Sequence, residues 1–314
     1  MSPSDLLGRL AAPFRAWEAW LFAPADARIY ALVRIGYAIT CAAVVLDLWP
    51  NREAFFTTGG MIAVVPDWHP LVLLRHVQTR ESISIVMVCV LIACVSLAAG
   101  LLTRAMTFVL WSWTVSYSLI MVPADSGYDG VLRVVGLVLL VSPAARAFAL
   151  DGRLLGQTRA LVPSYGLRLL QFQFCVLYFA TVWIKAPEPA WRNGQLMSYF
   201  MMSAYSRFPS PAWASLGRTS TLMSWGTLAI EGLLPVLVWS THFRRSALFC
   251  GVCLHLGIAL GSTIGLFTLA MCPLYAVFLQ PADLTAVSSL VRRCTRSARA
   301  ARTVSSSAET TTDD

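Results

Sequence analysis

The sequence is organised as a series of long apolar stretches, each near the length of a membrane-spanning helix. A helix that crosses the hydrocarbon core of a bilayer needs about 20 consecutive, mostly apolar residues. By this criterion the chain has eight candidate spans, at residues 29–48, 82–102, 105–122, 131–149, 165–185, 220–240, 245–263 and 264–280. The last two form one run that only Gly-Ser-Thr-Ile-Gly at 261–265 interrupts, so a hairpin and a broken helix are both open.

Residues 5–22 follow a different, amphipathic pattern. At helical spacing, one face collects Leu6, Leu10, Phe14, Trp17 and Leu21, and the opposite face collects Arg9, Arg15 and Glu18. This pattern predicts a helix that lies in the membrane interface, and we expect no cleavable signal peptide ahead of the first span.

Composition agrees with a membrane protein. Apolar residues make up 57% of the 314 residues and charged residues 13%, against about 45–50% and about 25% in soluble domains. This excludes a soluble globular protein and disorder over most of the chain. The net charge of +8 does not indicate nucleic-acid binding, because the arginines lie between apolar stretches. We predict an all-α fold, a polytopic membrane helix bundle of about eight spans.

Cysteine and histidine spacing indicates neither a disulfide framework nor a metal site. Seven of the eight cysteines fall within apolar stretches and Cys294 lies in the basic tail, so we interpret them as small buried apolar side chains. Cys250 and Cys253 lie on a predicted membrane helix, where we interpret them as packing residues. His69 and His76 have no third ligand nearby, and we predict no metal.

Arginine distribution predicts the topology. Most arginines outside the spans fall in the segments that are cytoplasmic if both termini are cytoplasmic. We therefore expect a multi-pass protein of the cell inner or plasma membrane, with one domain over residues 1–285. Residues 286–314, basic and then rich in Ser, Thr and Asp, predict a disordered cytoplasmic tail. The high arginine content suggests a GC-rich bacterial source.

Ionisable residues at membrane depth are the candidates for function, since each costs at least about 2.5–3.5 kcal/mol at a helix centre. They are Arg34, Asp47, Arg133, Lys185, Glu231 and His255. For Arg34 we expect packing against a glutamate or backbone carbonyls, and we interpret Asp47 and Arg133 as structural.

Lys185 is the only lysine and closes the fifth span. Gln171, Cys175, Tyr178 and Thr181 precede it at helical spacing, which forms one polar stripe. Desolvation favours the neutral amine, which can act as a base, whereas a lysine at a helix end can also simply snorkel to the interface.

Glu231 and His255 lie near the middles of the sixth and seventh spans. They can form a proton-coupled pair with each other, or each can hydrogen-bond to a neighbouring span as a structural contact. The pattern alone leaves both alternatives open.

Several motifs in order resemble the HTTM family, the membrane domain shared with vitamin K-dependent gamma-carboxylases. They are Trp-Glu-Ala-Trp-Leu-Phe-Ala-Pro-Ala-Asp at 17–26, Tyr-Ala-Leu-Val-Arg-Ile-Gly at 30–36, Asp47 with the loop at 55–60, Ala-Leu-Asp-Gly at 149–152, the aromatic segment 178–185 ending in Lys185, Trp-Arg-Asn-Gly at 191–194, and His255 ahead of Gly265 and Phe267. The resemblance covers about residues 17–280.

The resemblance implies a site on the outer side of the membrane. In the carboxylases, a lysine matching Lys185 deprotonates a reduced quinone, vitamin K hydroquinone. Oxygen then adds, and the resulting strong base removes a proton from a glutamate that captures CO2. By this resemblance Lys185 and His255 would be catalytic, and Tyr178, Tyr128, Glu231 and Trp191 would contact the quinone or substrate.

Two departures from the carboxylases shape the functional hypotheses. Where they carry a second histidine, this chain has Tyr128, and no His lies in residues 123–130. The large soluble region that follows their membrane domain is replaced here by about 30 residues. In length the chain is closer to short bacterial members of the sporulation-delaying-protein B type, which act with small partners in maturing a secreted peptide.

Three functions follow as hypotheses. The first is a quinol-linked enzyme. The second is a non-catalytic scaffold or partner in the maturation or export of a secreted peptide. The third, a transporter, is disfavoured because the chain shows no inverted repeat of interrupted helices.

Overall fold

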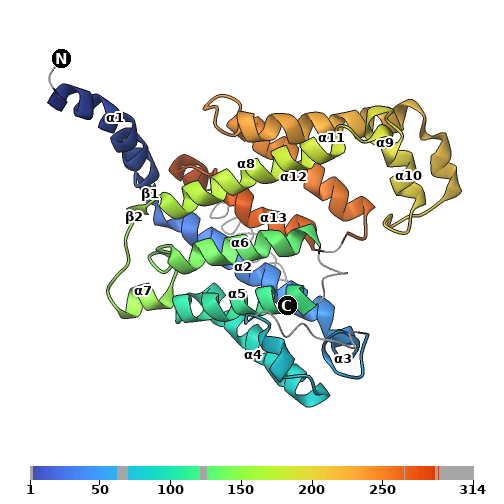
Figure 1. Ribbon diagram of the computed structural model, residues 1–314, viewed down its shortest axis with the longest axis horizontal. Helices are drawn as coiled ribbons and strands as arrows, with labels where there is room; N and C mark the ends of the chain where they lie inside the picture. The colour runs from blue at the N-terminus through green and yellow to red at the C-terminus, as the bar shows by residue number, and fades with distance from the viewer. Residues whose placement is uncertain (1–2, 62–69, 121–125, 265, 287–288, 290–314) are drawn as a thin grey trace, which may run out of the picture. The chain divides into compact units, whose positions relative to one another are not determined.

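Helices make up nearly all of the regular structure in the computed structural model (Figure 1). The structure describes residues 3–61, 70–120, 126–264, 266–286 and 289, with side chains from residue 12 onward. The chain divides into a unit Met1–Phe278, which contains every element named below, and a unit Leu279–Asp314, in which residues 281–286 are helical. The all-α prediction is confirmed.

Each of the eight predicted spans coincides with a helix. These are α2 (Ala27–Leu48), α4 (Arg80–Ala99), α5 (Thr103–Ile120), α6 (Gly127–Val141), α8 (Tyr165–Lys185), α11 (Arg218–Leu237), α12 (Arg244–Gly261) and α13 (Phe267–Ala276). By length and composition, four can cross a membrane: α2 with its continuation to Phe56, α4, α8 and α11. The chain is therefore a membrane protein, and the number of eight spans remains a prediction.

The predicted boundaries were wrong for two of the eight stretches. The fourth stretch begins earlier and ends earlier than expected, because Ser126 and Asp129 form a capping box at the start of α6 and Pro143 follows its C-cap. The eighth is a helix of 10 residues, α13, with Pro273 inside it. The run from 245 to 280 is a hairpin, since Gly251 packs against Tyr275 and the Thr268 hydroxyl donates to the His255 carbonyl.

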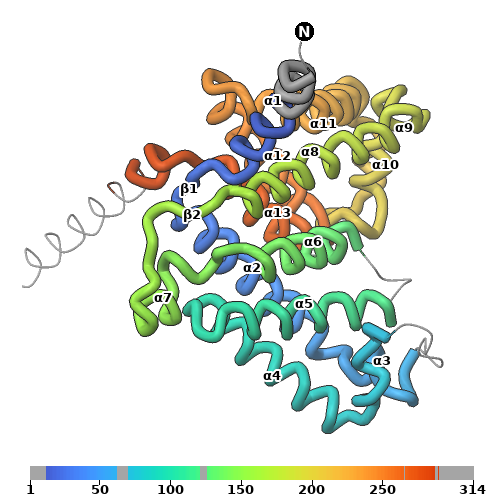
Figure 2. Tube along the Cα trace, turned by 60° about the vertical axis from the view of Figure 1, so that its left-hand side comes forward, coloured from blue at the N-terminus to red at the C-terminus, as the bar shows by residue number. Residues whose placement is uncertain are grey.

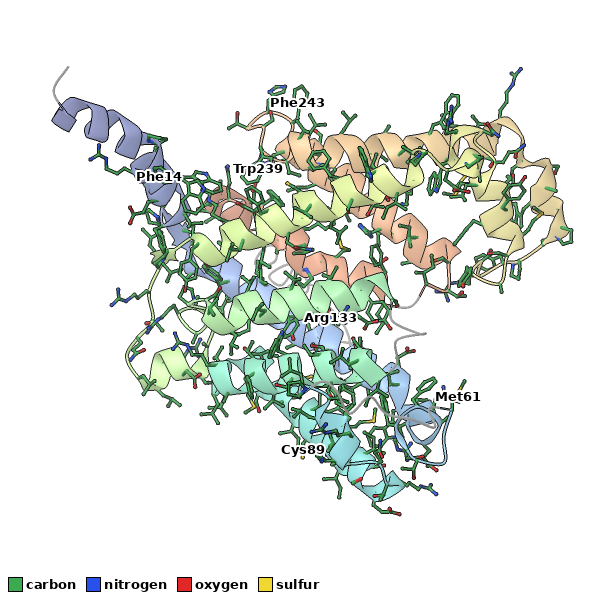
Figure 3. The ribbon with its side chains drawn as sticks, viewed as in Figure 1. Phe14, Met61, Cys89, Arg133, Trp239 and Phe243 are labelled. Carbon is green, nitrogen blue, oxygen red and sulfur yellow. The ribbon has the colours of Figure 1, made fainter. Side chains whose placement is uncertain are left out.

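Short elements connect these helices. They are η1 (Trp49–Asn51), α3 (Arg52–Phe56), η2 (Leu73–His76), α7 (Leu150–Leu154), α9 (Pro189–Arg192), α10 (Leu196–Met202) and η4 (Pro211–Leu216). Strands β1 (Pro24–Asp26) and β2 (Leu161–Pro163) pair antiparallel, with Ala25 opposite Val162. The predicted N-terminal helix is present as α1 (Pro3–Leu21), and Phe14 and Trp17 on its apolar face are exposed (Figure 3).

The helices of Met1–Phe278 pack in two groups, which are joined by α13 and by the packing of α6 on α8 (Figure 2). In one group α2 packs on α4, α4 on α5, and α5 on α6; in the other, α8 and α12 both pack on α11. Helix α13 contacts α2, α6, α8 and α12. Its approach to α2 is close, because a Cβ at Gly36 would lie 3.0 Å from the Pro273 ring.

Much of the helical surface is apolar, as expected for contact with lipid. Phe243 projects outward at the turn between α11 and α12, and Cys89 lies on the outside of α4 (Figure 3). The prediction that the cysteines are buried was wrong for four of them: Cys89, Cys250, Cys253 and Cys272 are exposed. In a membrane protein an apolar stretch need not be internal, because its outer face contacts hydrocarbon.

Arg34 is the most completely buried charged side chain, with 0% exposure. Its guanidinium donates to the carbonyls of Ala144 (2.7 Å) and Phe148 (2.6 Å), and at longer distance to those of Ala147 and Ala98. It thereby ties α2 to the end of α4 and to the segment after α6. The expected contact with backbone carbonyls is confirmed.

Asp151 fixes the turn between α4 and α5. Its carboxylate accepts from the backbone N–H groups of Leu102 (2.9 Å) and Thr103 (2.8 Å) and from the Thr103 hydroxyl. Burial raises the pKa of the Asp151 carboxyl, but the hydrogen bonds from Thr103 and Leu102 outweigh it, so the pKa lies below its ordinary value. The short Asp motif at 149–152 therefore serves here as a cap for α5.

Arg34→Ala should strongly destabilise the protein, because four carbonyls, that of Ala144 buried and the other three partly buried, lose this donor. Hydrogen bonds to charged groups are worth about 1.5–3 kcal/mol each, so we expect a loss of at least about 3 kcal/mol for the two short ones. Thermal unfolding in mild detergent measures this, with Arg153→Ala at an exposed arginine as control. Equal melting temperatures for the two variants would contradict this role of Arg34.

Candidate functional site

The polar stripe of α8 faces α11, α12 and α13. In the N-terminal half of α8 the Gln171 amide donates to the Val277 carbonyl (2.8 Å), and the Trp239 indole N–H donates to the Cys175 sulfur (3.4 Å). The Thr181 hydroxyl donates to the Leu177 carbonyl of its own helix. These three residues therefore make structural contacts, which leaves Tyr178 and Lys185 as the residues of the stripe that bond to ionisable side chains of other helices.

Lys185 is paired with Glu231 of α11. Its ammonium donates to Oε1 at 2.7 Å and to Oε2 at 2.8 Å. The Glu231 side chain is 7% exposed and that of Lys185 25%, so the pair lies at the edge of the protein interior. The Lys185 nitrogen also lies 4.9 Å from the centre of the Trp191 ring, a cation–π contact that α9 provides.

Tyr178 is the centre of a second buried group. Its hydroxyl lies 2.7 Å from Nε2 of His255 and 2.7 Å from the hydroxyl of Tyr275. All three side chains are buried. Among the residues that the structure describes, Nδ1 of His255 has no hydrogen-bond partner.

Aromatic rings enclose this second group. The Phe174 ring packs on Tyr178 (4.7 Å between centres) and edge-on against Tyr275 (5.3 Å), and Phe267 packs on the His255 ring (5.4 Å). The His255 ring is thus surrounded largely by the apolar faces and edges of aromatic rings.

The two groups belong to one site, because both depend on α8. Tyr178 and Lys185 are two turns apart on the same helix face, about 10 Å along its axis. Lys185 is close enough to interact electrostatically with His255, and Glu231 with Tyr178. Of the two sequence alternatives for Glu231 and His255, each bonding to a neighbouring span is the one observed, and both bond to α8.

Tyr128 lies in the first turn of α6, beside a further buried pair in which the Tyr117 hydroxyl donates to Asp129. The adjacent Gly127 packs against Phe267, since a Cβ there would lie 3.5 Å from that ring. Tyr128 is therefore one residue from the aromatic wall around His255.

Sequence reasoning missed Tyr275, Phe174 and Phe267 as parts of the site. All three lie in apolar stretches, where an aromatic residue gives no signal of its own. Phe267 was noted only as part of a motif spacing. The hydroxyl of Tyr275, unusual within so apolar a stretch, was the one available sign.

No group of three or more His, Cys, Asp or Glu side chains lies together in the part of the chain that the structure describes. His69 falls outside the described residues, and the Nε2 atom of His76 accepts from the Arg75 guanidinium.

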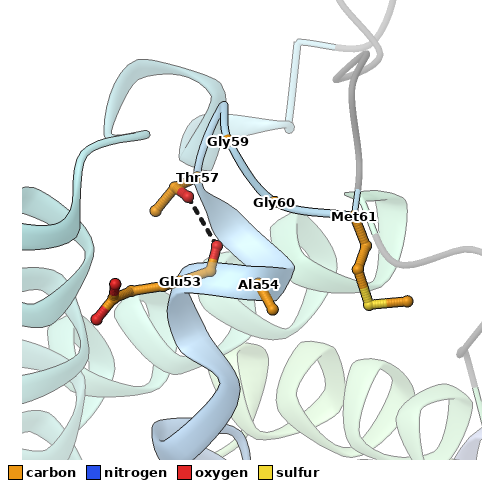
Figure 4. A pocket seen from close by; sticks show the side chains of 6 residues that line it. All are labelled: Glu53, Ala54, Thr57, Gly59, Gly60 and Met61. Atoms are coloured by element: carbon orange, nitrogen blue, oxygen red, sulfur yellow. Dashed lines mark hydrogen bonds between the residues drawn. The ribbon is translucent and has the colours of Figure 1, made fainter.

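A surface pocket lies elsewhere, at α3 and the loop that follows it (Figure 4). It is lined by Glu53, Ala54, Thr57, Gly59, Gly60 and Met61, and it shares no residue with the site on α8. The Glu53 carboxylate is paired with Arg80 at 2.9 Å.

The fold and the buried polar site define an all-α membrane protein built to hold ionisable groups between its helices. The HTTM domain model matches residues 22–282, nearly the whole chain, and the chain belongs to the HTTM family. It is thus a membrane protein related to the membrane domain of the gamma-carboxylases. The searches of curated proteins and of solved structures found no match.

Loss of one partner of the Lys185–Glu231 pair should destabilise the protein more than loss of both. Lys185→Met alone leaves a buried carboxylate uncompensated, and we expect a cost of about 3 kcal/mol. The double variant with Glu231→Leu removes that penalty and should recover part of the stability. Unfolding in detergent measures the cycle, with Glu188→Leu at an exposed glutamate as control. Strictly additive losses would show that the pair is not coupled.

Proposed function

We propose that this protein is a quinol-linked membrane enzyme of the gamma-carboxylase-like type, with Lys185 as its base. The observation that carries the proposal is the bidentate pair of the only lysine with Glu231, two turns from the buried Tyr178–His255 contact. An anchoring lysine at a helix end requires neither a buried carboxylate nor a neighbouring histidine.

The Lys185–Glu231 pair can supply a neutral amine. If the proton in the short hydrogen bond moves from Nζ to the carboxylate, the ion pair becomes a neutral amine and a neutral carboxylic acid. A proton transfer within the pair removes both charges at once, so it leaves no uncompensated charge between the helices. The amine can then accept a proton from an acidic hydroxyl, and Glu231 holds the first proton meanwhile.

The residues present fit a reduced quinone. His255 offers a buried ring nitrogen without a partner among the described residues, and the Trp191 and Phe267 rings offer flat apolar surfaces. A quinol has complementary features, a flat ring with hydroxyls. When bound, it would supply the electrons that reduce O2 in a true carboxylase, and that reduction would provide the strong base needed to remove a proton from a glutamate side chain before CO2 adds. Tyr178 would orient His255, and Tyr128 would border the site.

A second candidate is a non-catalytic partner in the maturation of a small secreted peptide. It is favoured by the completeness of the ion pair, which satisfies Lys185 without any ligand, and by Tyr128 at the place of a carboxylase histidine. In either case we propose a bacterial inner or plasma membrane, both termini cytoplasmic and Lys185 toward the outer side.

Lys185→Arg should abolish activity while the protein stays folded. Arginine can keep the contact with Glu231 but cannot become neutral, so it cannot accept the proton. A general base contributes about 10²–10⁴-fold, and we expect a loss of at least 100-fold in quinol consumption by protein in vesicles supplied with reduced 2-methyl-1,4-naphthoquinone under oxygen.

Mass spectrometry of the protein purified in mild detergent separates the two candidates. A quinone that accompanies the wild type and is lost in Lys185→Ala supports the enzyme. A preparation with lipid only and a small secreted or membrane protein supports the partner function. Full activity of Lys185→Arg would exclude the amine as base. Arg192→Lys, at an exposed residue of the neighbouring helix α9, controls for the substitution.

A further inference from the structure

We infer that Tyr178 and Tyr275 are positioning residues that hold His255 in the tautomer with its proton on Nδ1, so that His255 presents a hydrogen-bond donor, and not a base, to the site. The inference rests on the chain of contacts Tyr275–Tyr178–His255, with 2.7 Å at each step, and on the unpartnered Nδ1 at its end. It depends on the proposed function only for the identity of the group that Nδ1 meets.

The chain of hydroxyls can run in two directions. In the first, Tyr275 donates to Tyr178, Tyr178 donates to Nε2, and the imidazole proton is on Nδ1. In the second, Nε2–H donates to Tyr178 and Tyr178 donates to Tyr275, so that Nδ1 is a bare acceptor and the Tyr275 proton points elsewhere. Both directions contain the same number of protons.

Counting partners decides between the directions. The first leaves one buried group without a described partner, the Nδ1–H donor. The second leaves two, the Nδ1 acceptor and the Tyr275 hydroxyl proton. A buried unsatisfied polar group costs about 1–3 kcal/mol, so the first direction should dominate by roughly 5- to 150-fold.

Packing prevents the chain from finding other partners. Water has little access, because the exposure is 2% for Tyr178, 5% for His255 and 8% for Tyr275. The Tyr275 hydroxyl is held against Gly251, where a Cβ would lie 2.3 Å from it. The Thr268 hydroxyl fixes the backbone of His255 by donating to its carbonyl at 2.8 Å.

A donor at Nδ1 selects the chemistry of the ligand. It fits an acceptor oxygen, such as the carbonyl of a quinone or the oxygen of a quinol that has given its proton to Lys185. Preorganised donors aimed at developing negative charge are an effective means of catalysis. Lys185 and His255 would then have complementary functions, the first as proton acceptor and the second as donor to the oxygen that becomes negative.

The tautomer can be measured directly on the full-length protein in detergent. The chain has four histidines, so ¹⁵N-histidine labelling gives few signals, and the His255→Asn spectrum identifies those of His255. We expect Nδ1 protonated and Nε2 unprotonated in the wild type, a mixture of tautomers in Tyr178→Phe, and the wild-type tautomer with a weaker Nε2 hydrogen bond in Tyr275→Phe. Protonation of Nε2 alone in the wild type, or of both nitrogens, would overturn the inference.

A binding measurement tests the donor separately from the proposed function. The probes are 2-methyl-1,4-naphthoquinone, which has acceptor oxygens, and 2-methylnaphthalene, which has none. We expect His255→Phe to weaken quinone binding about 10-fold, the equivalent of one hydrogen bond, and to leave the hydrocarbon unaffected. Equal effects on both probes would contradict the donor role. If the wild type bound neither probe, the quinol function would fail, and the tautomer result would still stand.

Discussion

The structure depends on one constraint, that polar groups buried in an apolar environment must find their partners within the protein. Arg34 meets it by donating to carbonyls at the end of α4 and in the segment after α6. Asp151 meets it nearby by accepting from the first N–H groups of α5. The Arg34 and Asp151 contacts fix α2, α4, α5 and α7 to one another through hydrogen bonds that lipid could not replace, since lipid tails offer neither donors nor acceptors.

The same constraint builds the site on α8. Along one face of that helix, Gln171 and Cys175 satisfy themselves against neighbouring helices, whereas Tyr178 and Lys185 bond to ionisable side chains of α12 and α11. The two kinds of residue on this helix face thus differ in whether their hydrogen-bond partner is able to exchange a proton. The ion pair at Lys185 is for this reason compatible both with a lysine that acts as a base and with one that only anchors the helix. Variants that alter proton exchange but keep the hydrogen bonds are needed to distinguish these two roles.

Much of the fold could be predicted from sequence, because apolar length and helical spacing reflect local physics. The eight helices, the contact of Arg34 with carbonyls and the polar stripe along one face of α8 were all predicted. The ends of helices were harder to predict from hydropathy. The capping box at Ser126 sets where α6 begins, and α13, which contains a proline, is shorter than its apolar stretch. The pairing of Lys185 with Glu231 could not be predicted, because it depends on which helices become neighbours. Tyr275 escaped notice for the same reason.

Nδ1 of His255, which has no partner among the described residues, bears on the choice between the two proposed functions. A histidine that only ties α12 to α8 needs one nitrogen, and a smaller hydrogen-bonding side chain would make that tie without burying a second polar atom. In a scaffold the Nδ1 atom costs about 1–3 kcal/mol, as other buried polar atoms without a described partner do, Nε of Arg34 and Nε1 of Trp113 among them. In a binding site the same Nδ1 atom is useful, because an oxygen of the ligand can accept its hydrogen bond and so recover that free energy. The charges of Lys185 and Glu231 cancel in the ion pair, and the neutral amine and carboxylic acid carry none. The pair therefore has no net charge in either form. When a bound hydroxyl loses its proton, a buried hydrogen-bond donor at His255 would stabilise the negative oxygen that remains.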